Sequence, residues 1–169
     1  MTDERSETTE PFGPQRFQPT PTETTEVFWE ATRNRTYLVQ WCTACDAPIF
    51  YPREVCPQCL RSDALTWRPS SGRGQIYAHS VQHRPAHPGM ADLVPYVVAL
   101  VDLDAGHGGR TVRIMSNITE VDPGDVHNGD AVGLVWEPLD DGRHLAVFTP
   151  AGAPADTAAG AHDGATSDA

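Results

Sequence analysis

Cys42-Thr43-Ala44-Cys45 and Cys56-Pro57-Gln58-Cys59 are two CxxC pairs with ten residues between them, and they decide the fold. Each CxxC pair forms a tight knuckle that directs two thiolates at one point, and two knuckles supply four sulfurs in a tetrahedron. The spacing therefore predicts a closed structural zinc site made of Cys42, Cys45, Cys56 and Cys59. Rubredoxin-type iron uses similar geometry, so the residues leave zinc and iron open. Asp46 follows the first pair, where a left-handed turn is expected that Asp tolerates better than most residues.

The residues before the first cysteine predict a helix and a strand. Thr20-Pro21-Thr22-Glu23 has the form of a capping box with Pro at the first helical position, which predicts a helix over 21–34. Its short apolar face would consist of Val27, Phe28 and Ala31. Trp29 lies off that face, where either the core or a partner would cover it. Residues 37–41 predict a short strand that leads into Cys42.

After the cysteines, a turn-rich hinge over 70–74 leads into strand patterns with no helical period. Five strands are expected, at 75–83, 96–103, 110–118, 131–137 and 144–149. In the third strand, one face would consist of Val112, Ile114, Ser116 and Ile118. Short strands between Gly- and Asp-rich turns fit a small Greek-key barrel, with the OB-fold favoured and an SH3-like barrel as the alternative.

The predicted fold class is mostly β, with an N-terminal helix, a four-cysteine zinc ribbon and a five-stranded OB-fold Greek-key barrel. The segments are a disordered 1–20, helix plus ribbon over 21–74, barrel over 75–150 and a disordered acidic tail over 151–169. Disorder is expected at both ends because they are polar and the tail lacks any large apolar side chain. The polar start MTDERSETTE predicts a cytoplasmic protein without a secretory signal, whose cysteines do not form disulfides.

The formal net charge of −11 is unevenly distributed along the chain. Residues 33–84 hold seven arginines and three acids, net +4, whereas residues 92–141 hold ten acids and two arginines, net −8. The acidity argues against a nucleic-acid protein held by bulk charge. All twelve basic residues are arginines, which excludes Schiff-base chemistry and a lysine phosphate clamp.

No catalytic constellation stands out in the sequence. We find no local nucleophile signature, no Gly-rich phosphate loop and no acid/base pair. His79, His83 and His87 recur every fourth residue, but the nearby prolines place them on a strand end and a loop. We interpret them as solvated, with a loop that reaches a partner's active site as the alternative. Asp102 and Asp104 lead into a turn and are also interpreted as solvated.

Five stretches together resemble a known family. They are Val27-Phe28-Trp29-Glu30, Tyr37-Leu38-Val39-Gln40-Trp41-Cys42, Tyr51-Pro52-Arg53, Ser71-Gly72-Arg73-Gly74 and Pro95-Tyr96-Val97-Val98-Ala99-Leu100-Val101. Over residues 21–150 the chain resembles the zinc-ribbon/OB-fold acyl-CoA-associated family, long catalogued as a domain of unknown function. The family usually has Gly where this chain has Asp46.

The resemblance implies a non-catalytic accessory subunit that binds and stabilises a thiolase-fold partner acting on acyl-CoA. In actinobacteria, similar domains are partners of thiolase-fold aldolases that shorten steroid side chains by retro-aldol cleavage of a CoA thioester. The arginine-only composition, typical of a GC-rich genome, favours this version. A biosynthetic thiolase or an HMG-CoA synthase-type enzyme is the alternative partner. A nucleic-acid-binding OB/zinc-ribbon module and an independent enzyme are the other classes.

Site residues follow from the same resemblance. Partner contacts are expected at Phe28, Trp29 and Tyr51, in a closed heteromer with two-fold symmetry. Acyl-CoA phosphates would require cations, and the candidates are Arg53, Arg73 and Arg84, because arginine binds phosphate through a bidentate fork. The expected cofactor is one structural Zn2+, and four cysteine ligands leave no open position for water.

Overall fold

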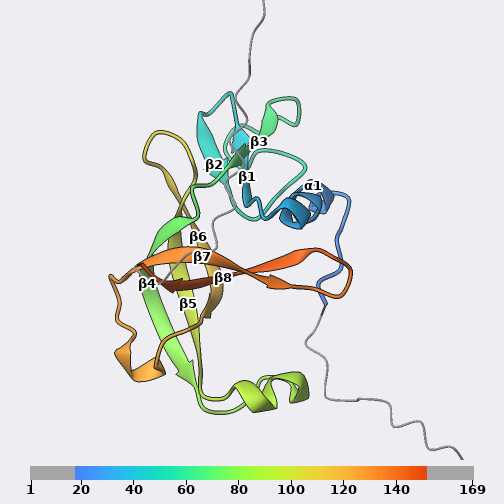
Figure 1. Cartoon of the computed structure of the whole chain (residues 1–169). Helices are drawn as coiled ribbons and strands as arrows, with labels where there is room; N and C mark the ends of the chain where they lie inside the picture. The colour runs from blue at the N-terminus through green and yellow to red at the C-terminus, as the bar shows by residue number, and fades with distance from the viewer. Residues whose placement is uncertain (1–17, 152–169) are drawn as a thin grey trace, which may run out of the picture.

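The structure of the chain is a computed structural model that describes residues 18–151, so both predicted disordered ends lie almost wholly outside it. In chain order its elements are α1 (Glu26–Ala31), η1 (Thr32–Asn34), β1 (Leu38–Cys42), β2 (Ala47–Ile49), β3 (Leu65–Pro69), β4 (Arg73–Gln82), η2 (Pro88–Leu93), β5 (Tyr96–Asp104), β6 (Thr111–Ile118), η3 (Pro123–Asp125), β7 (Ala131–Pro138) and β8 (His144–Pro150). Figure 1 shows the ribbon of β1–β3 at one end of a barrel, with η2 at the other end. Within residues 18–151, no helix is long and apolar enough to cross a membrane.

The five strands β4 to β8 form a closed barrel in the order β4-β5-β6-β8-β7. Neighbours are antiparallel except β6 and β8, which run parallel and pair at Ile118 and Phe148. The last strand therefore lies between the third and fourth barrel strands, which is the Greek-key arrangement of an OB-fold. The OB-fold prediction is confirmed, and the SH3-like alternative is wrong. Val112, Ile114 and Ile118 are buried on one face of β6, as their alternation predicted.

The ribbon is a three-stranded antiparallel sheet in the order β2-β1-β3. Its central strand, β1, contributes Val39 and the fully buried Trp41 to a core that continues into the barrel. Barrel members of the same core include Val101, Leu103 and Phe148. The ribbon and the barrel therefore pack against each other through one continuous apolar core.

The helix is shorter than predicted. α1 begins at Glu26 rather than at Pro21, because the segment before it forms a side-chain turn. In that turn the Thr22 backbone N–H donates to Thr25 Oγ1 at 2.9 Å, and such local bonds compete with helix formation. The capping-box prediction is therefore wrong. The helical stretch does end at Asn34, where Arg35 adopts a left-handed conformation with a φ of 53°.

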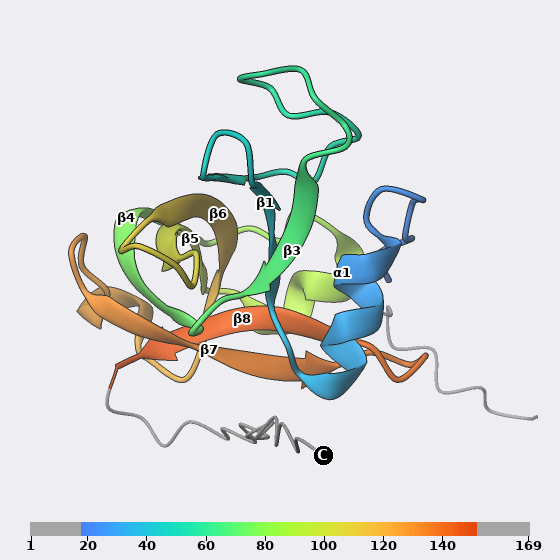
Figure 2. The same ribbon diagram turned by 90° about the horizontal axis from the view of Figure 1, so that it is seen from above.

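The helix packs on the ribbon and on the β7–β8 hairpin (Figure 2). The Phe28 ring meets the Tyr37 ring edge-on, with 5.1 Å between centroids, and it contacts the shared core. Trp29 meets Phe28 at 5.1 Å, and the Arg143 guanidinium lies 5.1 Å from a Trp29 ring centroid. The chain itself therefore covers part of Trp29.

Polar contacts fasten the same segment to the start of β8. Thr32 is fully buried, and its Oγ1 accepts a hydrogen bond from the His144 backbone N–H at 3.2 Å. Arg143 is only 6% exposed and donates from Nη2 to the Pro19 carbonyl at 2.7 Å. The backbone N–H and the guanidinium of Arg143 hold the pKa of Asp141 below its usual range. These contacts fix the N-terminal part of the described chain against its C-terminal hairpin.

The loop between β5 and β6 packs closely against the end of β3 at Gly106. Gly106 has a φ of 79°, and a Cβ at this position would overlap the Pro69 carbonyl oxygen. We expect Gly106→Ala to lower the free energy of unfolding by about 2 kcal/mol or more, from backbone strain plus this overlap. Urea unfolding measures the loss.

Gly108→Ala is the matched control. Gly108 also has a positive φ, 62°, but an added Cβ would meet open space. Its free energy of unfolding should therefore fall only by the cost of a left-handed Ala, about 1–2 kcal/mol. Equal losses in the two variants would contradict the close contact between the loop and the ribbon.

Candidate functional site

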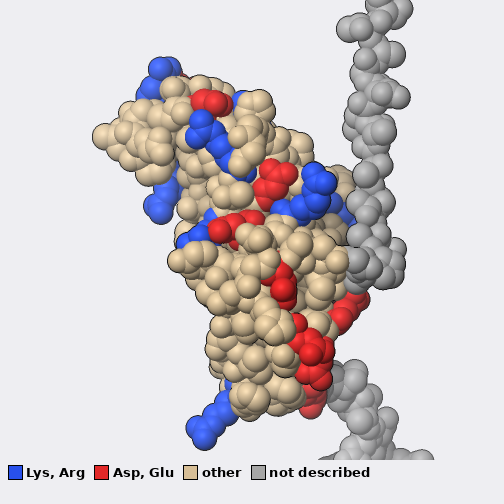
Figure 3. All heavy atoms as spheres, turned by 90° about the vertical axis from the view of Figure 1, so that its left-hand side faces the viewer, with Lys and Arg blue, Asp and Glu red and all other residues tan. Residues whose placement is uncertain are grey.

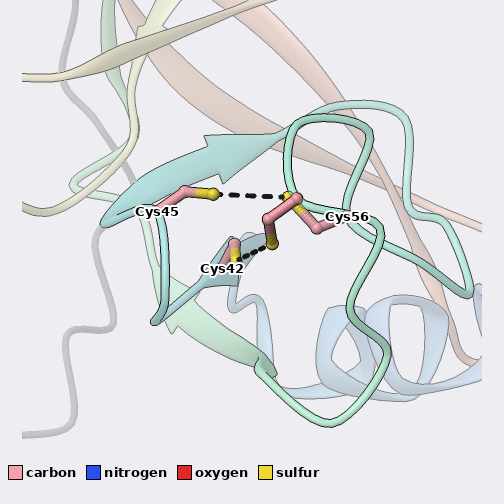
Figure 4. Close-up of side chains that lie close together, drawn as sticks. Cys42, Cys45 and Cys56 are labelled. Carbon is pink, nitrogen blue, oxygen red and sulfur yellow. Dashed lines mark hydrogen bonds between the residues drawn. The ribbon is translucent and has the colours of Figure 1, made fainter.

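The four cysteine thiols converge inside the ribbon (Figure 4). Cys42 ends β1, Cys45 lies in the turn before β2, and Cys56 and Cys59 lie in the segment between β2 and β3. The Sγ atoms of Cys42 and Cys59 are 3.7 Å apart, those of Cys45 and Cys56 are 3.9 Å apart, and all four lie within 4.8 Å of one another. A tetrahedron with metal–sulfur bonds of ~2.3 Å has sulfurs ~3.8 Å apart. The four side chains are therefore positioned to bind one metal ion.

Backbone geometry after each CxxC pair shapes the two knuckles. Asp46 and Leu60 occupy equivalent positions and are both left-handed, with φ of 48° and 59°. The left-handed turn predicted at Asp46 is therefore confirmed. In the second knuckle, backbone N–H groups of Cys59 and Gln58 lower the pKa of Cys56 to about 7. N–H donors favour the thiolate, which is the form that binds a metal.

Each thiol also affects the pKa of its neighbours in the cluster. Hydrogen bonding with the Cys59 thiol raises the pKa of Cys45 to about 12. With this pKa raised, the chain without metal keeps at least one proton on the cluster at neutral pH. Metal binding therefore displaces protons, and competition from protons grows as the pH falls.

Metal retention should depend on pH in one direction. Lowering the pH from about 7 to about 5 protonates the thiolates and should release the ion, whereas raising the pH should restore binding. Bound metal after gel filtration at stepped pH values measures this. Full retention at about pH 4 would contradict a four-thiolate site.

A buried amide holds the loop that precedes the second pair. Gln40 of β1 donates from Nε2 to the Arg53 carbonyl and accepts from the Arg53 backbone N–H, both at 2.8 Å. The two bonds position the segment that carries Cys56. No pattern in the sequence singled out Gln40, because an isolated Gln in an apolar strand has no fixed meaning.

The residues that flank the first pair join the metal site to the barrel. Trp41 Nε1 donates to Asp46 Oδ1 at 3.2 Å, and the other oxygen of Asp46 lies 3.6 Å from Arg110. His107 meets Trp41 edge-on, with 5.6 Å between ring centroids. Arg110 and His107 both belong to the loop between β5 and β6. This link gives the Asp46 carboxylate a structural role between the ribbon and the barrel.

Removal of the metal should therefore loosen that loop. Without the ion, Trp41 and Asp46 lose the fixed cysteines beside them, so we expect amides of 105–110 to exchange hydrogen at least tenfold faster. Hydrogen exchange with and without a chelator measures this. The η2 segment at the other end of the barrel is the internal control. Unchanged exchange over 105–110 would contradict the link.

The arginines proposed for acyl-CoA lie on separate elements, and all are exposed. Arg53 lies in the ribbon segment before Cys56, Arg73 begins β4, and Arg84 lies just beyond the end of that strand. A ten-residue strand is about 30 Å long at ~3.3 Å per residue. Arg73 and Arg84 therefore cannot contact the same diphosphate.

The expected partner contacts differ in how much surface they offer. Tyr51 is exposed on the ribbon, and the exposed side chains of Val55 and Leu60 lie in the same loop region. Phe28 is half-buried and packs on the core, so its neighbour Val27 offers more apolar surface. Sequence reasoning missed Val27 as a surface residue because it was assigned to the core face.

Two aspartates interpreted as solvated are partly exposed and also have structural partners. Asp102 accepts two hydrogen bonds from Arg113, at 2.8 and 2.9 Å. Asp104 accepts from the Ser71 hydroxyl at 2.6 Å and the Gly106 N–H at 2.9 Å, and these bonds lower its pKa. The partners come from other elements, which the turn pattern around the aspartates does not reveal.

The histidines do not form a metal-binding group in the described part of the chain, where the four cysteines are the one such cluster. His79 Nδ1 lies 2.8 Å from Asn128 Oδ1, and His87 Nδ1 accepts from the Gly89 N–H.

A pocket of about 210 Å³ lies at the η2 end of the barrel and is lined by Met90, Leu93, Pro95, Tyr96, Val97, Asn117, Ile118, Thr119, Glu120, Val121, Pro123 and Glu137. Its lining comes from separate segments, so no local motif marked it.

A four-cysteine ribbon packed on an OB barrel defines the class of this protein. Residues 29–66 match the family model described as ChsH2, rubredoxin-like zinc ribbon domain, and residues 67–137 match ChsH2, C-terminal OB-fold domain. The chain belongs to this ChsH2 family of zinc-ribbon/OB-fold proteins, also called DUF35, and the resemblance seen in the sequence is confirmed.

A solved structure, described as Ltp2-ChsH2(DUF35) aldolase, contains a similar chain. The likeness has a TM-score of 0.68 and 32% sequence identity, and it covers 79% of this chain and 99% of that chain. A DUF35 domain-containing scaffold protein of Methanothermobacter thermautotrophicus is 36% identical over 95 residues, which are 56% of this chain and 67% of that protein.

Two relatives have names that refer to hydratases. A probable enoyl-CoA hydratase alpha subunit of Thermomonospora curvata is 35% identical over 80% of this chain and 46% of that protein. The 3-oxo-4,17-pregnadiene-20-carboxyl-CoA hydratase alpha subunit of Mycobacterium tuberculosis is 29% identical over 71% of this chain and 36% of that protein. The chain thus spans less than half the length of both hydratase subunits.

Proposed function

We propose that this chain is a non-catalytic accessory subunit that binds and stabilises a thiolase-fold enzyme acting on acyl-CoA. The enzyme would be an aldolase that cleaves a steroid side-chain CoA thioester by a retro-aldol reaction. The observation that carries the proposal is the likeness to a chain of the Ltp2-ChsH2(DUF35) aldolase, 99% of which this chain covers. This chain therefore has nearly the whole fold of that chain, which supports a similar role as a subunit.

A scaffold for another thiolase-type enzyme is the second candidate. The 36% identity to the archaeal DUF35 scaffold protein favours it, since this chain covers 67% of that protein. The partner would then be a biosynthetic thiolase or an HMG-CoA synthase-type enzyme. The hydratase names belong to relatives of which this chain spans less than half.

The metal in the proposed subunit is a structural Zn2+. The donor set supports this, because four sulfurs at tetrahedral separations match the ligands that zinc favours. Zinc bound there would have no open position for water, so its role is to cross-link β1 to the segment before β3. Cys42, Cys45, Cys56 and Cys59 would hold it.

The proposed partner surface includes α1 and the ribbon. Tyr51 and Trp29 are the aromatic candidates, because aromatic side chains often supply much of the binding energy of an interface. Phe28 would act by holding α1 in place. Arg53 and Arg73 remain candidates for CoA phosphates, and Arg84 would contact only a separate group.

Co-expression with the thiolase-like protein encoded beside this chain tests the proposal. We expect one complex by size exclusion with light scattering, with equal numbers of the two chains and two-fold symmetry. Elemental analysis of the complex should give one zinc and no iron for each copy of this chain. Activity should require both chains, with neither turning over a steroid CoA thioester alone.

Separate elution of the two chains under all salt conditions would contradict the proposal. Turnover by this chain alone would instead identify it as an independent enzyme. Salt-dependent binding of single-stranded DNA would favour the nucleic-acid class.

A further inference from the structure

Three large apolar side chains form an exposed row on the outer face of the barrel. Tyr77 of β4 is 54% exposed, Leu100 of β5 is 36% exposed and Met115 of β6 is 67% exposed. Leu100 and Met115 pair directly in the register of β5 and β6. Tyr77 lies at the bulge where the β4–β5 register shifts between Ile76 and Ala78. We call these three residues the barrel patch.

The polar groups beside the barrel patch already satisfy one another. The Arg113 guanidinium lies 3.3 Å from the centroid of the Tyr77 ring. Asp102 holds that guanidinium by two hydrogen bonds, from Nε at 2.8 Å and from Nη2 at 2.9 Å. Arg113 therefore has its fork occupied and is poorly placed to grip a phosphate. The patch suits an apolar protein surface better than a phosphorylated small molecule.

An acidic loop joins β4 beside the patch through its end at Gly129 and Asp130, while its start at Glu120 lines the pocket near η2. The loop over 119–130 carries Glu120, Asp122, Asp125 and Asp130. It is attached beside Tyr77, because the Gly129 N–H donates to the Ile76 carbonyl at 2.7 Å and the Ile76 N–H donates to the Asp130 carbonyl at 2.9 Å. Figure 3 shows acidic side chains gathered along one margin of the lower part of the face in view, beside a broad uncharged area.

We infer that the barrel patch is a docking site for a protein partner that presents apolar side chains bordered by lysine or arginine. An apolar centre with a charged rim is the usual anatomy of an interface, and opposite charges at the rim set its orientation. The outer face of these strands is also where OB-folds commonly bind their ligands. The acidic rim disfavours nucleic acid. This inference rests on the proposed function, and the occupant is the thiolase-like subunit.

Substitution at the most exposed member tests the inference. Met115→Glu adds a carboxylate at the β6 end of the barrel patch, on a side chain that is 67% exposed. We expect it to weaken binding to the co-expressed thiolase-like protein at least tenfold, measured by calorimetry or surface plasmon resonance. Tyr77→Gln, which removes the aromatic anchor, should also weaken binding. Raising the salt concentration should slow association of the unmodified chain, because rim charges steer it.

Leu93→Glu is the matched control, since Leu93 is an exposed apolar residue, 47% accessible, in η2 at the far end of the barrel. It makes the same change of charge and should alter affinity less than twofold. Circular dichroism and thermal unfolding check that each variant is folded. If Met115→Glu does not fold, Tyr77→Gln takes its place as the test variant.

The possible results separate the two proposals. If the unmodified chain binds the partner and Met115→Glu binds as well as Leu93→Glu does, the docking inference is overturned and the proposed function stands. If the unmodified chain does not bind at all, both fail. If the unmodified chain alone is a dimer that Met115→Glu converts to a monomer, the occupant is a second copy and the inference is overturned.

Discussion

Burial of the β1 strand from both sides is the constraint on which the structure depends. One end of β1 supplies Cys42 to the thiol cluster, and the preceding Trp41 has no exposed surface. The Arg68 guanidinium stacks over the Trp41 indole, 4.3 Å from a ring centroid. A charged side chain therefore covers one face of this buried aromatic ring. A small ribbon with few apolar residues could not hold this strand in place by itself. The cysteine cluster and the barrel core together hold β1 in place.

This arrangement explains how an acidic protein with modest apolar content keeps a rigid shape. Ion pairs such as Arg61 with Asp63 lie at the surface and contribute little to stability. One apolar core instead includes buried residues of both the ribbon and the barrel. The charges are left for the outer faces, where the basic ribbon and the acidic barrel face solvent or partners.

Local pattern predicted most of the secondary structure, because strands with alternating apolar residues and paired cysteines carry their own signals. The buried face of β6 and the left-handed Asp46 followed directly from such signals. The start of α1 was not predicted correctly, because the sequence is compatible with both a capping box at Thr20 and the Thr22–Thr25 turn that forms. Contacts between distant segments also escaped prediction. Asp102, Gln40 and the barrel patch acquire meaning only when separate strands come together, and no single stretch of sequence records that.

The fastening of Pro19 and Thr32 to the β7–β8 hairpin has a consequence for how the chain reaches its structure. The partners in these bonds are 124 and 112 residues apart in sequence. During synthesis the helix would emerge long before Arg143 and His144, so the part of its docking site on the β7–β8 hairpin is missing until nearly the whole described chain is available. Such distant contacts slow folding, since the entropy of closing a long loop is lost before the contact is gained. Of the described elements, the helix is thus the first made and among the last to gain all its contacts, which leaves Trp29 without its Arg143 partner in the interval.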